Sequence, residues 1–72
     1  MNIGLTIKAL RIGRKLTQQA AADRAGMNWT VWADLEHNRC SPTVATLERV
    51  AIGLGMDLAE IFRRPRKTGA GL

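Results

Sequence analysis

Apolar residues recur along the chain at intervals of three and four, which is the spacing of amphipathic helices. The first such segment runs from Ile3 to Lys15 without a proline and predicts a helix. Its main apolar stripe consists of Ile3, Ile7 and Leu10. A second apolar set falls on the opposite face: Leu5, Ala9 and Ile12. Because that second face exceeds what the core of a small domain needs, we expect a partner to cover it.

Two short helices joined by a tight turn are predicted next. Thr17 can cap a helix over Gln18 to Ala25, whose alanines favour helix formation. Gly26 can end this helix because glycine adopts the left-handed conformation without a steric penalty from a Cβ atom. Asn28 then provides a cap for a third helix from Trp29 to about Glu36.

The remaining pattern predicts a loop and two further helices. A polar loop covers His37 to Pro42. Thr43 caps a fourth helix that Gly55 ends, and Asp57 opens a fifth helix with a capping-box glutamate three residues later. The apolar positions are Val44, Leu47, Ala51 and Leu54 in the fourth helix and Leu58, Ile61 and Phe62 in the fifth. We therefore expect an all-α fold, a compact bundle of about five short helices over residues 1–62.

Length and composition narrow the class of protein. A chain of 72 residues with 46% hydrophobic and 24% charged residues is typical of one small globular domain. No apolar run is long enough to span a membrane, and no cleavable leader opens the chain, so we expect a cytoplasmic location. The single Cys40 can form no internal disulfide, and with one histidine it provides no metal framework. We expect Cys40 to be an inert loop thiol.

The net charge indicates the kind of partner. Eleven Lys and Arg residues against six Asp and Glu residues give a charge of +5, which favours a polyanion, and nucleic acid before a membrane. Residues 63–72 form a basic tail that we expect to be flexible. The cluster from Arg63 to Lys67 is interpreted either as a solubilising tail or as a sequence-independent electrostatic contribution on DNA.

The segment from Gln18 to His37 has helix-turn-helix spacing. Counted from Gln18, its small or apolar positions and its glycine are the fourth, fifth and eighth (Ala21, Ala22, Ala25), the ninth (Gly26) and the tenth, fifteenth and eighteenth (Met27, Trp32, Leu35). Two helices that cross after a short turn need a small residue at the fifth position and a permissive one at the ninth. The spacing therefore predicts a helix-turn-helix unit over residues 18–37.

The chain resembles the lambda-repressor-like, Xre-type helix-turn-helix domain from Ile3 to Phe62. The matching motifs are Leu16-Thr17-Gln18, Ala22, Ala25-Gly26-Met27, Leu35-Glu36, Ser41-Pro42-Thr43, Thr46-Leu47, Leu54-Gly55 and Leu58-Ala59-Glu60-Ile61-Phe62. The resemblance implies a sequence-specific, double-stranded DNA-binding transcriptional regulator that acts as a homodimer on a palindromic operator. We expect no enzymatic activity, because no nucleophile–base pair or carboxylate dyad can be picked out from these residues, and we expect no cofactor, metal or small-molecule substrate.

The resemblance also assigns roles to individual residues, because the third helix of the family lies in the major groove. The base-facing positions are Asn28, Trp29, Thr30 and Asp34. The positions expected on DNA phosphates are Thr17, Gln18, His37, Asn38 and Arg39, although Gln18 and His37 are also interpretable as ordinary solvated residues. Arg11 and Glu36 are expected to form a partly buried ion pair between the first and third helices.

Several residues depart from the family pattern. Asp34 stands where members commonly carry Arg or Gln, so it either accepts from a cytosine amino group or repels phosphates. Trp29 is interpretable as a thymine-methyl contact or as part of a protein interface. Ala21 replaces the usual leucine and Trp32 a β-branched residue, so we expect the indole to fill the volume that helix two has lost. Ala20 leaves the Thr17 cap without its acidic partner.

Two classes of function remain open. The first is the dimeric regulator, with Leu5, Ile12 and Ile52 covered by a second copy. The competing interpretation is that the tail after Phe62 folds back over these three residues within one chain. The second is a protein-interaction module of the same fold, such as an antitoxin that binds a toxin through Trp29, Asp34 and the face formed by Leu5 and Ile12.

Overall fold

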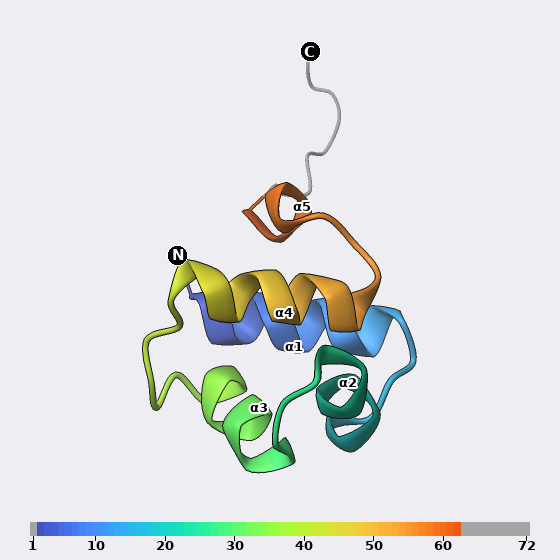
Figure 1. The fold of residues 1–72 in the computed structure, drawn as a ribbon, viewed down its shortest axis with the longest axis horizontal. Helices are drawn as coiled ribbons and strands as arrows, with labels where there is room; N and C mark the ends of the chain where they lie inside the picture. The colour runs from blue at the N-terminus through green and yellow to red at the C-terminus, as the bar shows by residue number, and fades with distance from the viewer. Residues whose placement is uncertain (1, 63–72) are drawn as a thin grey trace.

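Five helices form the part of the chain that the computed structural model describes, residues 2–62. Their bounds are α1 Ile3–Gly13, α2 Gln18–Ala25, α3 Trp29–Glu36, α4 Val44–Leu54 and α5 Leu58–Phe62. Figure 1 shows α1 and α4 running in the same direction, with α2 and α3 on one side of them and α5 on the other. These residues contain no strand, and the predicted all-α fold is confirmed. The predicted basic tail, residues 63–72, lies outside the described residues.

Side-chain caps begin four of these helices. The Thr17 hydroxyl accepts a hydrogen bond from the backbone N–H of Ala20 at 3.0 Å, so this cap forms without an acidic partner. Asn28 caps α3 and Thr43 caps α4 in the same way, as predicted. Asn2, which no sequence pattern singled out, caps α1. Each such cap contributes about 1 kcal/mol by satisfying a backbone donor that the helix leaves free.

Left-handed residues end most of the helices. Gly26 and Gly55 both have φ of +70°, which confirms the predicted ends of α2 and α4. The predicted end of the first helix at Lys15 is wrong, because α1 ends at Gly13 and Lys15 itself has φ of +58°. Glycine in a sequence indicates a left-handed residue, whereas lysine does not. The predicted end of the first helix is therefore two residues too late.

The hydrophobic core lies between the helices and is one cluster. Its buried members are Ile7, Ala21, Ala22, Ala25, Trp32, Leu35, Leu47, Val50, Ala51, Leu54 and Ile61. The predicted anchors Leu58 and Ile61 are part of or packed against this cluster, but Phe62 is 48% exposed and is not an anchor. Ile61 and Phe62 are neighbours in the five-residue helix α5, and side chains about 100° apart cannot both face the core. Ile61 faces it and Phe62 does not.

Gly53 allows α4 to approach α2 closely. A Cβ atom at this position would lie 2.8 Å from the Cβ of Ala25 and 2.9 Å from the carbonyl oxygen of Ala21. The cost of glycine in the middle of a helix, roughly 1 kcal/mol, is therefore offset by contact between the two helix backbones.

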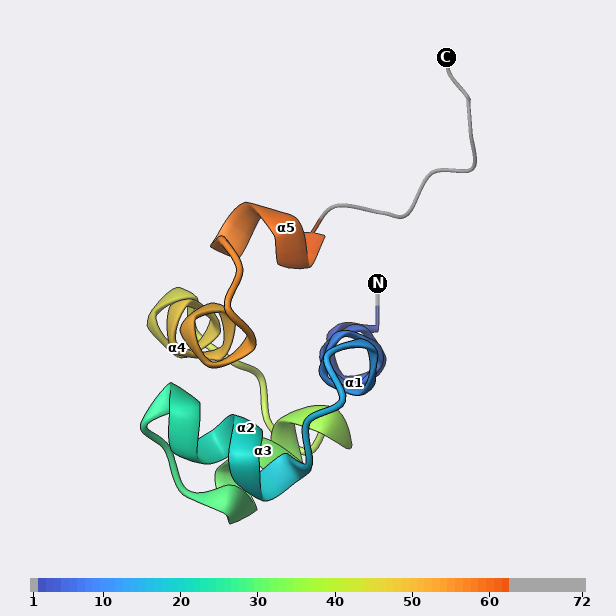
Figure 2. The same cartoon turned by 90° about the vertical axis from the view of Figure 1, so that its right-hand side faces the viewer.

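Two apolar surfaces remain exposed. Leu5 and Ile12 are 60% and 55% exposed on α1, and Ile52 is 68% exposed on α4. Figure 2 shows α1 and α4 at opposite sides of the fold, so the two apolar surfaces belong to separate helices. Among residues 2–62, no helix has the length and apolar composition needed to cross a membrane.

Candidate nucleic-acid interface

The third helix presents one face to solvent and one to the core. Trp32, Leu35 and Glu36 are buried. At about 100° per residue, the positions opposite these three are Thr30, Ala33, Asp34 and the adjoining His37. Trp29 and Val31 flank this face and are 48% and 42% exposed. The first turn of α3 is therefore its most accessible part.

Three of the four predicted base-facing residues, Asn28, Trp29 and Thr30, lie at this first turn, and Asp34 lies one turn later. The Oδ1 atom of Asn28 accepts from the backbone N–H of Thr30 at 2.8 Å, which leaves its amide NH₂ group for an external acceptor. Thr30 and Trp29 are exposed, and the Asp34 side chain is 38% exposed. No predicted role pointed to Val31, because periodicity places it at the margin of the buried face.

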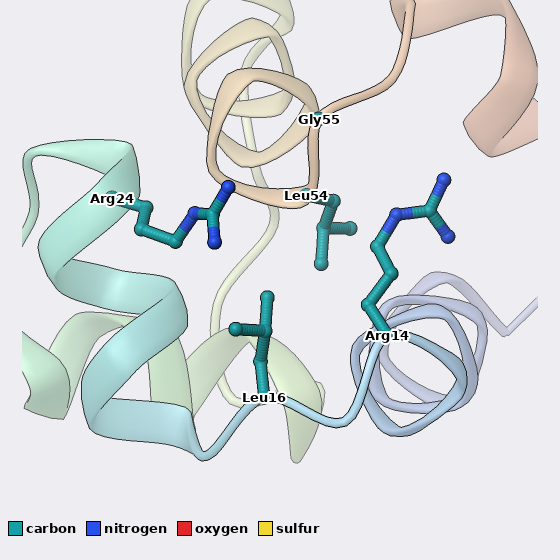
Figure 3. A pocket seen from close by; sticks show the side chains of 5 residues that line it. All are labelled: Arg14, Leu16, Arg24, Leu54 and Gly55. Atoms are coloured by element: carbon teal, nitrogen blue, oxygen red, sulfur yellow. The ribbon is translucent and has the colours of Figure 1, made fainter.

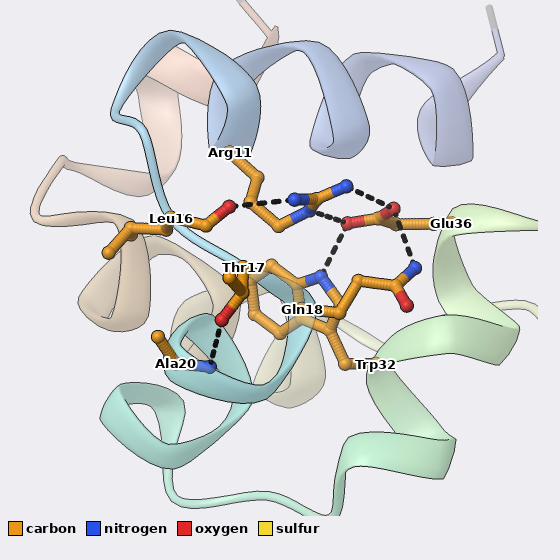
Figure 4. Close-up of polar contacts among 7 residues, drawn as sticks. All are labelled: Arg11, Leu16, Thr17, Gln18, Ala20, Trp32 and Glu36. Carbon is orange, nitrogen blue, oxygen red and sulfur yellow. Dashed lines mark hydrogen bonds and ion pairs between the residues drawn. The ribbon is translucent and has the colours of Figure 1, made fainter.

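Glu36 is the centre of a buried hydrogen-bond network that joins three helices. The Nε–H of Arg11 donates to Oε2 of Glu36 at 2.6 Å, and Nη2 donates to Oε1 at 3.3 Å (Figure 4). The Gln18 amide and the Trp32 indole N–H also donate to this carboxylate. The exposed fractions of the Glu36 and Arg11 side chains are 1% and 12%. The predicted ion pair is confirmed, and Glu36 connects α1, α2 and α3.

The protonation of Glu36 reflects this network. Burial by itself raises the pKa of the Glu36 carboxyl, because it disfavours the charged form. Hydrogen bonds from Arg11, Gln18 and Trp32, together with the positive charge of Arg11, outweigh that effect and hold the pKa below its ordinary value. Glu36 is therefore ionised at neutral pH, and its charge is compensated within the fold.

The start of α2 combines a cap with the Glu36 network. The Nε2 atom of Gln18 donates to Oε1 of Glu36 at 3.0 Å, so one amide hydrogen is committed to the interior. The Thr17 hydroxyl accepts from Ala20 N–H and keeps its own hydrogen for an external acceptor. Thr17 and Gln18, two of the five residues predicted to contact phosphates, therefore also have a structural role. The sequence did not indicate such a role for Gln18. The free N–H groups of the first turn of α2 lie beside them.

Asn38 attaches the loop after α3 to the start of α1. It has φ of +57°, its Oδ1 accepts from the Gly4 N–H at 3.0 Å, and its amide donates to Oδ1 of Asn2 at 2.7 Å. A Cβ atom on Gly4 would come within 2.6 Å of the backbone carbonyl oxygens of Glu36 and Leu35, so only glycine permits this approach. Asn38 therefore has a structural role in addition to its predicted phosphate contact.

The other two loop residues are accessible. His37 is exposed, and the Arg39 side chain is 71% exposed and lies 3.7 Å from the carboxylate of Asp34. Cys40 is also exposed and free, as expected for a loop thiol.

Arg14 and Arg24 flank a pocket at another part of the surface. This cavity of about 310 Å³ is also lined by Leu16, Leu54 and Gly55 (Figure 3). Within residues 2–62 the ion pairs are Arg11 with Glu36 and Arg39 with Asp34, so neither flanking guanidinium has an acidic partner there. No lining residue comes from α3, and these two cations form a surface distinct from the exposed face of that helix.

The positive charge of the chain is unevenly distributed. Seven of the eleven basic residues and all six acidic residues lie within residues 2–62, which leaves a net charge of +1 there. The other four basic residues are Arg63, Arg64, Arg66 and Lys67. The folded domain is therefore almost neutral by itself.

Comparison with known proteins places this arrangement in a family. A family model described as a helix-turn-helix domain matches residues 2–62. The immunity repressor protein of Bacillus phage phi105 is 43% identical over 61 residues, which cover 85% of this chain and 42% of the repressor. The ImmF control region 10 kDa protein of the same phage is 38% identical over 56 residues, which cover 78% of this chain and 62% of that protein. The chain thus spans less than two thirds of either relative.

Solved structures share the fold. A transcriptional regulator of the HTH_3 family from Vibrio cholerae superposes with a TM-score of 0.81 at 33% identity, over 85% of this chain and 34% of that one. The wild-type restriction-modification controller protein C.Esp1396I superposes with a TM-score of 0.79 at 24% identity, over 85% of this chain and 79% of that one. The chain therefore belongs to the helix-turn-helix domain family, as its lambda-repressor-like motifs predicted.

Proposed function

We propose that the chain is a sequence-specific regulator that binds double-stranded DNA as a homodimer on a palindromic operator. The observation that carries this proposal is the accessible first turn of α3, held against α2 and α1 by the buried Glu36 network. A rigid helix with an exposed amino-terminal turn is what the major groove accepts. A DNA partner implies a cytoplasmic location, and binding of this kind requires neither a catalytic group nor a cofactor.

Base recognition is assigned to the first turn of α3 and phosphate recognition to its surroundings. The amide of Asn28 and the hydroxyl of Thr30 suit hydrogen bonds to base edges, and the Trp29 indole suits a thymine methyl group. Five groups are assigned to phosphates: the Thr17 hydroxyl, the second amide hydrogen of Gln18, and the side chains of His37, Asn38 and Arg39. Val31 joins the apolar contacts because it is exposed beside Trp29.

The direct test is selection of duplexes by the purified protein, followed by affinity measurements at several salt concentrations. We expect an enriched sequence with two-fold symmetry and tighter binding to it than to a random duplex. Each phosphate that a basic side chain neutralises should add about 0.9 to the slope of log K against log salt. Binding that shows no preference over random duplex at moderate salt would contradict the proposal.

The apolar surface of α4 and α5 is the proposed dimer interface. Ile52 stands beside a groove of about 330 Å³ that is also lined by Ala51, Met56, Leu58 and Glu48. An exposed aliphatic side chain next to an apolar groove suits an interface in which each copy inserts the same residue into its partner. Two recognition helices would then be set about 34–36 Å apart, one turn of DNA.

Replacing Ile52 by glutamate should convert the dimer to a monomer. The charge would be buried in the interface without a partner, whereas in the monomer Ile52 is 68% exposed, so folding is expected to persist. Sedimentation at micromolar concentration measures the effect. The matched control is Ile12→Glu, the same change on the outer face of α1, which should leave the dimer intact. A dimer that survives Ile52→Glu but is lost with Ile12→Glu would assign the interface to α1.

The second candidate function, a protein-interaction module, rests on the face of α1. Leu5 and Ile12 are exposed on α1, and neither belongs to the proposed interface of α4 and α5. An antitoxin-like partner would cover them. Absence of any DNA sequence preference, together with loss of partner binding in Ile12→Glu, would favour this function over the first.

A further inference from the structure

The turn that ends α3 brings Asp34 and Arg39 together. The backbone N–H of Arg39 donates to the carbonyl of Asp34 at 2.9 Å, and that of Asn38 donates to Leu35 at 3.2 Å. With Asn38 in the left-handed conformation, this is a Schellman motif. Such a turn brings the third residue after the helix back to the last helical turn, where an apolar contact is common. Here an acid and a base occupy those two places.

The position of this turn is fixed by contacts outside it. Asn38 is hydrogen-bonded to Gly4 and Asn2 at the start of α1, and Gly4 has no room for a side chain. The backbone of Arg39 is therefore held in place, while its side chain, 71% exposed, is free to reorient. Arg39 can reach either the Asp34 carboxylate or an acceptor beyond the protein surface.

The ion pair is weak enough to exchange. Its N–O distance is 3.7 Å and both side chains are solvated, and pairs of this kind contribute little to stability. A DNA phosphate offers the same guanidinium two oxygens and a bidentate geometry. The carboxylate of Asp34 and a phosphate thus compete for one cation.

We propose that Asp34 is a specificity-determining residue that acts by retaining Arg39. This inference rests on the proposed DNA-binding function. On a duplex that offers α3 no matching base contacts, Arg39 stays with Asp34 and does not neutralise a phosphate, so non-specific affinity is low. Asp34 is then neither a direct reader of cytosine nor a simple source of repulsion, the two roles that its residue type alone suggested.

A double-mutant cycle on a labelled random 20-base-pair duplex tests this proposal. Asp34→Asn should tighten binding by about fivefold, which corresponds to release from a surface ion pair. The same substitution in an Arg39→Ala background should change affinity by less than about twofold. Arg39→Ala alone should weaken binding to the selected duplex, on which Arg39 is expected to contact a phosphate. Asp34→Asn should also steepen the salt slope by about 0.9, as expected for one additional phosphate contact.

Asp57→Asn is the matched control, because it makes the same change of charge in the turn before α5, which Figure 1 shows on the opposite side of the bundle from α3. It should alter affinity by less than about twofold. Equal tightening by Asp34→Asn in both backgrounds would show direct repulsion and overturn the inference. Loss of selectivity at one C·G pair of the selected duplex, without tightening on random duplex, would show cytosine reading and also overturn it. If none of these proteins, the unmodified chain included, binds DNA, the proposed function fails and the inference with it.

Discussion

Replacing Glu36 by glutamine should lower the free energy of unfolding by roughly 3–5 kcal/mol, the usual cost of breaking a buried ion pair from one side. The carboxylate accepts from Arg11, Gln18 and Trp32, and an amide in its place cannot accept all of these bonds. Arg11 would also keep a largely buried charge without its anion. For a domain of this size the loss is a large part of the total stability.

Thermal and urea unfolding of the variant measure this effect. Asp57→Asn is the control because Asp57 is exposed and asparagine caps a helix as well as aspartate does, so this substitution should change stability by less than about 0.5 kcal/mol. If Glu36→Gln unfolds at the same temperature as the unmodified protein, the network does not stabilise the fold.

The dependence of stability on acid pH should differ between the unmodified protein and Glu36→Gln. The pKa of Glu36 is lower in the folded state than in the unfolded state. The stability that ionised Glu36 contributes is therefore complete above the unfolded pKa, about 4.3, and is lost as pH falls through the folded pKa. The stability difference between the unmodified protein and Glu36→Gln should therefore narrow as the solution is acidified below about pH 4. A constant difference down to pH 2 would contradict this assignment.

Replacing Ala21 by leucine should destabilise the protein by about 1–3 kcal/mol, although leucine is common there in similar domains. Ala21 and Trp32 are both completely buried in one core cluster, and the backbone carbonyl of Ala21 faces Gly53 at close range. The larger side chain therefore has no free volume to enter. Unfolding experiments on Ala21→Leu measure the cost, with Ala9→Leu on the exposed face of α1 as the control.

A double variant tests whether Trp32 compensates for Ala21. Trp32→Val alone should be strongly destabilising, because it removes core volume and the indole donor to Glu36. Ala21→Leu combined with Trp32→Val should lose less stability than the two single variants added together. A stabilised Ala21→Leu protein, or strict additivity, would refute the exchange of volume between α2 and α3.

Local signals explain why the helices could be predicted so closely. Thr17, Asn28 and Thr43 each cap a helix through a hydrogen bond within three residues, and Gly26 ends α2 through its own backbone conformation. These effects depend on neighbouring residues and are visible in the sequence. The end of α1 was missed because Lys15 adopts a left-handed conformation without a residue type that indicates it.

The interface was only partly predictable because several of its contacts are not local. The resemblance identified Arg11 with Glu36, and the structure confirms the pair. The bond between Asn38 and Asn2 spans 36 positions, and no periodicity connects them. The ion pair of Asp34 with Arg39 depends on the turn at Asn38 that ends α3. Periodicity likewise showed which apolar residues are exposed but not how α1 and α4 are arranged in the fold.

The central claim is that the first turn of α3 reads bases while the start of α2 and the loop after α3 hold phosphates. An NMR titration of the isotope-labelled protein with the selected duplex tests it most directly, with a random duplex at the same salt as the reference. We predict the largest amide shifts at residues 17–19 and 28–39, and further shifts at residues 28–34 with the selected duplex alone. Shifts confined to α4 and α5, or an identical response to both duplexes, would contradict the claim.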